Sequence, residues 1–415
     1  MRTISSIFLT FIFLATILST FAQQAGCTDP LATNFNAAAV ENDGSCRYLP
    51  VFHNPPFAFE LPAKVSETSG LVFYHNKLWT INDSGGDATL YAIDTATHEI
   101  VRRVNVSNAV NVDWEEITMD QNYLYIGDFG NNRGNRKDLA VYRIDLTHLA
   151  GSGDYTVEAE KIRFHYPEQI DFKGSNNHNF DCEAFVSYND YLYLFTKNRG
   201  DQYTQLYRLP SAPGKHAASL IGSFNSVGLV TAAALNTERM EIVLLGYVQK
   251  VWTPFLWILF DFEGDDFFGG NKRRIDLANL STTQTEGICL IDSMNYFISS
   301  ESSPTFSSRV FRFNAAPWID HLDTNSRLRP MKGALIRLDE AASDSSKLVL
   351  IISKARTGKS RVDISDATGK VVYSVPVIIE KDAFYLEVDT IRIPEGKFIV
   401  SLINNRRIVS QEFAK

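Results

Sequence analysis

The middle of the chain is a repeating series of short apolar runs separated by turn-forming residues. Five times, a run with a polar or small beginning is followed by a second run rich in aromatic residues and a third that reads like Leu-Tyr-Arg-Leu. The first runs, roughly 46 to 68 residues apart, occupy 68–71, 114–117, 182–185, 231–234 and 285–288. The second runs occupy 77–83, 123–128, 191–197, 242–247 and 295–301, and the third runs 90–93, 141–144, 206–209, 256–259 and 310–313. Short runs of this kind, repeated at this spacing, predict β-strands and an all-β fold.

The repeats predict a β-propeller over residues 51–318, in which each repeat forms one blade of about four antiparallel strands. Five blades are visible, and a sixth would fit in the longest interval, between Glu115 and Glu183. The last repeat lacks a fourth strand, which residues 57–61 would supply from ahead of the first repeat, closing the ring. The alternative for this span is a β-sandwich, which would not repeat itself five times.

The repeats end at Trp318, and a different strand pattern begins near residue 335. Residues 319–334 are expected to be a linker, and residues 335–415 a small β-sandwich. Its predicted strands are 347–352, 360–364, 370–373, 383–388 and 397–402. The predicted fold class is therefore all-β, with a five- or six-bladed β-propeller followed by a small C-terminal β-sandwich.

The first 22 residues have the features of an export signal. A basic residue, Arg2, precedes the apolar run 7–18 and a small-residue ending at Ala22. The run is shorter than the roughly 20 residues that cross a bilayer, and no later segment is both long and free of charge. We expect a mature chain with no transmembrane segment, either secreted or attached to the outer cell surface.

Composition narrows the classes of partner. Aromatic residues make up 12% of the chain, which suits strands because flat side chains pack well on a pleated surface. The net charge is −8, and Lys and Arg do not cluster. Nucleic acid and anionic lipid both require a basic surface, so neither is expected as a partner.

Residues 23–50 are expected to form a short module closed by a disulfide. Cys27 and Cys46 bracket a segment too small to hold a core, and such segments are stapled in oxidising compartments. The segment resembles the Gly-Cys-Thr-Asp … Asp-Gly-Ser-Cys module of secreted Bacteroidetes proteins, which is akin to thrombospondin type 3 repeats. The other two cysteines, Cys182 and Cys289, lie in apolar strands and are expected to be buried thiols, with a bond between them left open.

Oxygen-bearing side chains in this module suggest a calcium site. Calcium takes six to eight oxygen ligands, and the candidates are Asp29, Asn34, Asn36 and Asp43. The alternative is that these residues are present for turns, which they favour without any metal.

A second candidate cation site lies in the propeller channel. The first strand of each blade lines the channel, so equivalent positions converge on one axis. These positions are Ser69, Glu115, Glu183, Ala232 and Glu286. Three carboxylates would repel one another unless a proton or a cation neutralises them, and oxygen ligands without clustered His or Cys favour Ca²⁺ or another divalent cation.

Polar residues that follow the second strands are expected at one rim of the channel. They are Asn82, Asp83, Asp128, Asn131, Asn132, Lys197, Asn198 and Glu301, of which Asp83 and Asp128 are further candidate ligands. Two alternatives stay open for the three glutamates. They would accept hydrogen bonds from neighbouring backbone N–H groups or pair with Lys197 or Arg199, or one of them would act as a catalytic carboxylate.

The segments 67–71, 79–85, 112–117, 126–132 and 181–184 together resemble a family of exported bacterial propellers. This resemblance runs from about residue 60 to residue 315. Members are distantly similar to propellers of the NHL and gluconolactonase type, some of which hydrolyse lactones or esters at a channel metal bound by Glu, Asn and Asp. The resemblance implies a propeller with a metal in its channel.

The C-terminal region resembles the sorting domain of the type IX secretion system. The resemblance is carried by 366–372, 393–400 and the ending 409–415. It implies that the type IX secretion machinery is a partner and that the domain directs the chain across the outer membrane. A carbohydrate-binding sandwich is the alternative, although no exposed row of aromatic residues is evident.

Two functions follow from these observations. The first is an extracellular binding protein whose propeller mouth holds an unidentified ligand or partner. The alternative is a metal-dependent hydrolase of the lactonase or phosphoesterase kind, acting in the channel.

Overall fold

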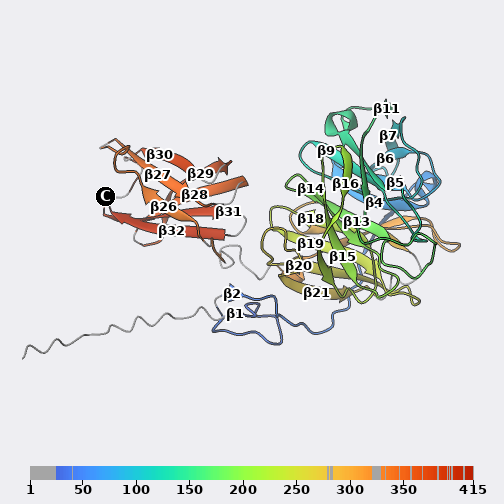
Figure 1. Ribbon diagram of the computed structural model, residues 1–415, viewed down its shortest axis with the longest axis horizontal. Helices are drawn as coiled ribbons and strands as arrows, with labels where there is room; N and C mark the ends of the chain where they lie inside the picture. Colours follow the sequence, from blue (N-terminus) through green and yellow to red (C-terminus); the bar gives the residue numbers. More distant parts are fainter. Residues whose placement is uncertain are drawn as a thin grey trace, which may run out of the picture.

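The computed structural model describes residues 25–414 except positions 40, 278–279, 281–283, 320–328, 332, 345, 356–357, 367, 381–382, 390, 392, 394–395 and 405–406. The predicted signal peptide, residues 1–22, and most of the predicted linker, residues 319–334, lie outside the described residues. Nearly all regular structure is strand, which confirms the all-β class (Figure 1). In the described part of the chain, no helix is long and apolar enough to cross a membrane.

Five antiparallel sheets form the propeller. Blade 1 contains β4 (Thr68–Tyr74), β5 (Lys77–Asn82), β6 (Thr89–Asp94) and β7 (Ile100–Val106). Blade 2 contains β8 (Trp114–Met119), β9 (Tyr123–Asp128), β10 (Ala140–Asp145) and β12 (Glu160–His165). Blade 3 contains β13 (Cys182–Tyr188), β14 (Tyr191–Thr196), β15 (Thr204–Pro210) and β17 (Ser219–Phe224). Blade 4 contains β18 (Leu229–Asn236), β19 (Glu241–Tyr247), β20 (Pro254–Phe260) and β21 (Asn271–Asp276).

Blade 5 joins the two ends of the propeller sequence. It contains β22 (Thr285–Leu290), β23 (Asn295–Ser300), β24 (Arg309–Asn314) and, as its outer strand, β3 (Phe57–Glu60). The pairing of β3 with β24 is antiparallel, with Glu60 opposite Arg309. The inner strands β4, β8, β13, β18 and β22 contact one another in this order, and β22 contacts β4. The predicted closure of the ring by the segment ahead of the first repeat is confirmed.

The longest interval between repeats holds no sixth blade among the described residues. Instead, the chain between β10 and β12 forms the 3₁₀ helix η2 (Leu146–Leu149) and β11 (Tyr155–Val157), which pairs in parallel with β7 of blade 1. The short strand β16 (Gly214–Ala217) likewise pairs in parallel with β12 of the preceding blade. The extra residues therefore fasten neighbouring blades together at their outer edges, and the propeller has five blades.

The core is divided into five clusters, one in each joint between neighbouring blades. Blades 1 and 2 pack through residues such as Trp79 and Trp114, and blades 2 and 3 through residues such as Phe129 and Phe185. Similar clusters lie between blades 3 and 4, 4 and 5, and 5 and 1. Because each sheet buries both faces against its neighbours, removal of one blade would expose two apolar faces.

The N-terminal module is closed by the predicted disulfide. Cys27 and Cys46 are bonded, with an S–S distance of 2.04 Å. Two residues each form β1 (Ala25–Gly26) and β2 (Glu41–Asn42), which pair in parallel. The module contacts blade 4, where Asn42 Nδ2 donates to Asp261 Oδ2 at 2.6 Å. Cys182 and Cys289 are free and buried, so the disulfide left open between them is absent.

The C-terminal region contains two sheets that share one apolar core, as the predicted sandwich requires. The larger sheet contains β29 (Val371–Ile379), β28 (Gly358–Asp366), β31 (Lys397–Asn404), β32 (Arg407–Ala414) and β25 (Arg329–Pro330). The smaller sheet contains β26 (Leu335–Leu338), β27 (Lys347–Ser353) and β30 (Ala383–Asp389). Figure 1 shows these strands as a body separate from the propeller.

We predict that the closing strand contributes to the stability of the propeller through Phe59. This side chain is buried between blades 5 and 1, with its ring 5.8 Å from that of Phe297, whereas Phe57 on the same strand is half exposed. Phe59→Ala should lower the free energy of unfolding by about 3–5 kcal/mol, because it leaves a cavity in the joint. The matched control Phe57→Ala should cost much less. Urea unfolding followed by near-ultraviolet circular dichroism measures both, and equal losses would contradict this role.

Candidate functional site

The ends of the strands bring the polar residues to one mouth of the channel. In every blade, the second strand ends and the first strand begins at the same face of the propeller. Asp83 and Lys197 directly follow second strands, whereas Asp113 and Asp181 directly precede first strands. Hydrogen bonds hold these loops together. Asn111 Nδ2 donates to the carbonyl oxygen of Asp83 at 2.8 Å, and Asn131 N donates to Asp181 Oδ1 at 2.7 Å.

A β-bulge near the start of each inner strand presents one residue to the channel. The pairing of first and second strands skips Glu115, Glu183, Thr231 and Glu286, and in blade 1 it skips Gly70, directly after Ser69. The extra residue of a bulge has no partner opposite it, so its side chain is re-aimed. Thr231 therefore holds the blade 4 position that the sequence assigned to Ala232. The sequence prediction was one residue off in blade 4, because the position of the bulge is decided by the pairing of β18 with β19 and not by the sequence of β18 alone.

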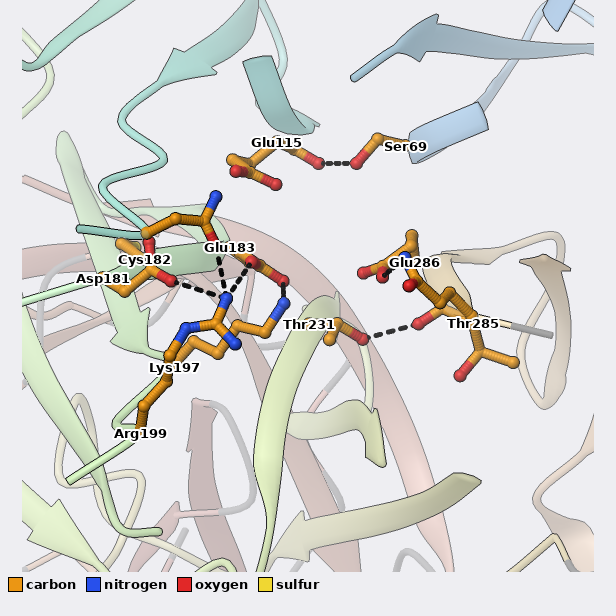
Figure 2. Close-up of polar contacts among 12 residues, drawn as sticks. Ser69, Glu115, Asp181, Cys182, Glu183, Lys197, Arg199, Thr231, Thr285 and Glu286 are labelled. Atoms are coloured by element: carbon orange, nitrogen blue, oxygen red, sulfur yellow. Dashed lines mark hydrogen bonds and ion pairs between the residues drawn. The ribbon is translucent and has the colours of Figure 1, made fainter. Parts of the chain in front are cut away.

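The channel positions of blades 1 and 4 are hydroxyl residues that bond to the next blade. Ser69 Oγ donates to the carbonyl oxygen of Glu115, and Thr231 Oγ1 donates to that of Thr285 at 2.7 Å. Figure 2 shows these two bonds on either side of the space that Glu115, Glu183 and Glu286 surround. The three glutamates are all buried and lie near one another: burial is the main cause that raises the pKa of Glu115 and of Glu286, and the charge of Glu183 adds to it in both.

Three carboxylates gather closely at the side of blades 1 and 2. One oxygen from each of Asp83, Asp113 and Glu115 lies within 4.8 Å of the others. Gly130 permits this approach, because a Cβ atom there would lie 2.0 Å from Glu115 Oε1. Glu115 is only 4% exposed, and within the described residues its carboxylate has no hydrogen-bond or ion-pair partner. We call Asp83, Asp113 and Glu115 the acidic triad.

On the neighbouring blade 3, the charges are paired within the protein. Lys197 Nζ forms an ion pair with Glu183 Oε2, and both side chains are about 95% buried. Arg199 Nη2 lies 3.2 Å from Asp181 Oδ2 and 3.7 Å from Glu183 Oε1 (Figure 2). Burial opposes the charge on Lys197, but Glu183 and Glu286 outweigh it and raise the lysine pKa above its usual value. The predicted pairing of a channel glutamate with Lys197 is therefore present at Glu183.

Besides the acidic triad, two glutamates on blade 5, Glu286 and Glu301, form an acidic pair. Gln284 Nε2 donates to Glu286 Oε1 at 3.3 Å and to Glu301 Oε2 at 2.9 Å. The other oxygen of Glu286, Oε2, is buried and has no hydrogen-bond partner among the described residues. Burial raises the pKa of Glu301 to about 7, and the nearby carboxylates of Asp83 and Glu67 add to this effect.

Crowding of like charges disfavours full ionisation of the acidic triad. Burial raises the pKa of Asp113 to about 6, and the charge of Asp83 contributes further. Burial, followed by the charges of Glu183 and Asp83, raises the pKa of Glu115 well above its usual range. Buried carboxylates that repel one another take up protons or bind a cation. The triad is therefore suited to a divalent cation with oxygen ligands.

Asp128, another predicted ligand, is engaged elsewhere. Its Oδ1 lies 2.9 Å from Arg136 Nη2 and accepts a hydrogen bond from Asp113 N at 3.2 Å. The structure thus brings Asp83 and Glu115 together, places Glu183 and Glu286 on the two adjoining blades, and gives Asp128 an internal partner. Metal binding at these five residues stays a prediction.

The proposed ligands of the N-terminal module all take part in its turns. Asp29 accepts hydrogen bonds from Leu31 N at 2.9 Å and from the Tyr48 hydroxyl at 2.7 Å. Asn34 Oδ1 accepts from Arg47 N, Asn36 Oδ1 from Ala38 N and Asp43 Oδ1 from Ser45 N. This arrangement favours the turn-forming interpretation, and calcium in the module remains a prediction.

Sequence reasoning missed two buried or half-buried acidic residues of the channel, Asp113 and Glu116. Asp113 could have been found, since an Asp-x-Glu spacing spans the start of the inner strand at both 113–115 and 181–183. Glu116 is fully buried. Its carboxylate accepts hydrogen bonds from the backbone N–H groups of Leu71 at 3.2 Å, Ile117 at 3.0 Å and Ala233 at 3.2 Å. It therefore binds inner strands of three blades across the channel.

We predict that the stability of the metal-free protein falls as the pH rises from about 4 to about 7. Glu301 and Asp113 have folded-state pKa values of about 7 and about 6, above the ordinary values of 4.5 and 3.8. The folded state therefore binds more protons than the unfolded state in this range, and the stability that protonation supplies is lost on ionisation. Thermal melts in chelator at several pH values measure the effect.

The variant Glu301→Gln serves as the control for this pH dependence. It removes one of the two titrating groups, so its melting temperature should change less between these pH values. Melting temperatures that rise with pH in the wild-type protein would contradict the prediction.

Comparisons with known proteins give no family for this chain. Neither a protein-family model nor a curated protein matches the sequence. Among solved structures, an exo-β-1,3-galactanase from Phanerochaete chrysosporium is similar at a TM-score of 0.38 and 10% identity, over 84% of this chain and 91% of that chain. Apo AztD from Citrobacter koseri is similar at a TM-score of 0.25 and 12% identity, over 78% of this chain and 75% of that chain. These likenesses are too distant to indicate a function.

Proposed function

We propose that this chain is a secreted or cell-surface protein whose five-bladed propeller binds a divalent cation, Ca²⁺, and an extracellular ligand at the channel mouth. The observation that carries the proposal is the acidic triad. Its deepest member, Glu115, is buried without a partner among the described residues, although an unpaired buried carboxylate is costly. A bound cation would remove this cost.

Calcium fits the ligand set and spacing of the triad. All three residues offer carboxylate oxygens, which are hard ligands, and the triad contains no His or Cys to favour zinc. Oxygens up to 4.8 Å apart can share one ion at Ca–O distances of about 2.3–2.6 Å. Because calcium takes six to eight oxygen ligands, positions on the ion would remain for water or for oxygen atoms of a ligand. The triad would thus hold both the cation and the group that the cation attracts.

We predict that calcium raises the melting temperature of the full mature chain relative to chelator. At a calcium concentration 100-fold above Kd, the stabilisation is about 2.7 kcal/mol. Glu115→Gln should lose most of it, because the buried ligand no longer carries charge. Differential scanning calorimetry with CaCl₂ and with EDTA measures the difference.

The matched control for this experiment is Asp87→Asn. Asp87 follows the same strand as Asp83, but it is exposed and pairs with Lys64 at 2.8 Å outside the triad. This variant should keep the full calcium response. Identical melting temperatures of the wild-type protein with calcium and with chelator would rule out a site in the triad.

The C-terminal domain is the basis for the proposed route of export, which is type IX secretion. Its two sheets have their own apolar core, so it can act as a separate sorting unit. The disulfide of the N-terminal module supports export, since such bonds form in oxidising compartments. The type IX secretion machinery is the partner that the sequence resemblance implies for this domain.

We predict that deletion of residues 335–415 leaves a folded propeller that does not reach the cell surface. Ring closure uses β3 and β24, both outside the deleted region, so the propeller should keep its own unfolding transition. Fractionation of a host with type IX secretion should find the truncated chain retained inside the cell, and the full chain at the surface or in the medium. Normal secretion of the truncated chain would refute the sorting role.

A further inference from the structure

Exposed apolar side chains gather on the face of the propeller that surrounds the channel mouth. Val110 and Val112 lie between β7 and β8, Ile170 lies between β12 and β13, and Val251 and Trp252 lie between β19 and β20. All are exposed, Ile170 to 90%. By contrast, in the described propeller the hairpin loops that join first to second strands, at the opposite face, expose no large apolar side chain. We call these five residues the apolar rim.

Nothing in the described N-terminal module covers the apolar rim. The module contacts Asp261 and Gly269 in the loop between β20 and β21. That loop joins a third strand to a fourth, so it emerges at the face opposite the mouth. Figure 1 shows the module beside β21. Exposed apolar residues in several loops around a polar centre are typical of a protein interaction site.

The backbone holds Trp252 in this position at an energetic cost. Trp252 has a φ of 55° and Lys250 a φ of 75°, in the left-handed region that residues other than glycine rarely adopt. The loop is tied by Trp252 N donating to the carbonyl oxygen of Val248 at 2.9 Å. The indole stacks on the buried Tyr247 ring, with centroids 4.7 Å apart. Strained residues that a loop keeps in place are concentrated at binding sites.

The charges next to Trp252 define the chemistry of its ligand. The Tyr247 ring lies between the indole of Trp252 and the charged centre of the mouth, since its centroid is 4.7 Å from that of the indole and 5.3 Å from Lys197 Nζ. Lys197 itself is paired with Glu183. Three buried oxygens of mouth residues that can only accept hydrogen bonds have no partner among the described residues: Asn82 Oδ1, Asn198 Oδ1 and Glu286 Oε2. The hydroxyl groups of Thr204, Thr285 and Ser300 also have no such partner, and they can accept as well as donate. These acceptors and the carboxylates beside them favour a ligand that brings N–H donors and positive charge.

We propose that the mouth face binds an extracellular polypeptide and receives one of its Lys or Arg side chains between Trp252 and the Glu286–Glu301 pair. An ammonium or guanidinium group is attracted by an indole face and by carboxylates together. The apolar rim then contacts apolar residues that flank the basic one, which is the usual arrangement of a central anchor inside a water-excluding border. The proposal goes beyond cation binding, because it uses blades 4 and 5 and not the acidic triad.

Short synthetic peptides with a central Lys or Arg flanked by Leu residues test this proposal. Fluorescence anisotropy of labelled peptides with the full mature chain should show binding that weakens as NaCl is added. The same peptide with Glu in place of Lys should not bind. Trp252→Ala and Glu301→Gln should each weaken binding about tenfold or more.

The matched control is Leu220→Ala. Leu220 has the same 42% exposure as Trp252 but lies on β17, the outer strand of blade 3. This variant should bind the peptides as the wild-type protein does, and every variant should keep a cooperative melting transition well above the assay temperature. An equal loss in Leu220→Ala, no preference for the basic peptide over the Glu peptide, or no binding at about 1 mM peptide would overturn the proposal. Binding of glycans but not of peptides would overturn it as well.

Chelation separates this proposal from calcium binding. The affinity of the wild-type protein for the basic peptide should persist in EDTA, because Trp252, Glu286 and Glu301 are not members of the acidic triad. Peptide binding without any calcium response would leave the docking proposal standing and refute the acidic triad as a metal site. A calcium response without peptide binding would do the reverse.

Discussion

The structure depends on how five inner strands close around one axis. Their inward-facing N–H groups have no further strand to pair with, and unpaired buried groups are costly. Glu116 accepts hydrogen bonds from three of them, on β4, β8 and β18. The positions after the bulge in blades 3, 4 and 5 are Ala184, Ala232 and Gly287, and a Cβ on Gly70 would lie 2.7 Å from Glu116 Oε1. These small residues leave room on the axis for the Glu116 carboxylate. Through its hydrogen bonds, this carboxylate links blade 4 to blades 1 and 2, which are not its neighbours.

The bulges also decide which side chains line the mouth. In blade 2, the bulge residue Glu115 directly precedes Glu116. Each bulge turns one residue toward the channel, and in three blades that residue is glutamate. The three glutamates have different surroundings. Glu183 is paired with Lys197, Glu286 shares Gln284 with Glu301, and Glu115 lies with Asp83 and Asp113. Repeated geometry with different neighbours thus gives one mouth two separate acidic clusters.

In the described part of the chain, the outer strands and the N-terminal module lie away from this mouth. The strands β11 and β16 fasten neighbouring blades at their outer edges, and the N-terminal module contacts blade 4 at the opposite face. The apolar rim and the charged centre lie on the same face, and neither these outer strands nor the described N-terminal module covers it. Rigid blades with loops at one end are a suitable support for binding residues, since the loops can vary without disturbing the joints between blades.

The sequence by itself determined the repeats, the closing strand at residues 57–61 and the disulfide. These follow from local patterns, because strand periodicity and cysteine spacing are visible along the chain. It also brought Glu115, Glu183 and Glu286 to one channel, since equivalent positions of a repeat converge on the axis. Only the tertiary structure decided the partners of each carboxylate, the change from Ala232 to Thr231, and the absence of a sixth blade. The register, the bulges and the pairing of β11 and β16 with neighbouring blades all depend on which strands lie side by side, so no local sequence pattern predicts them.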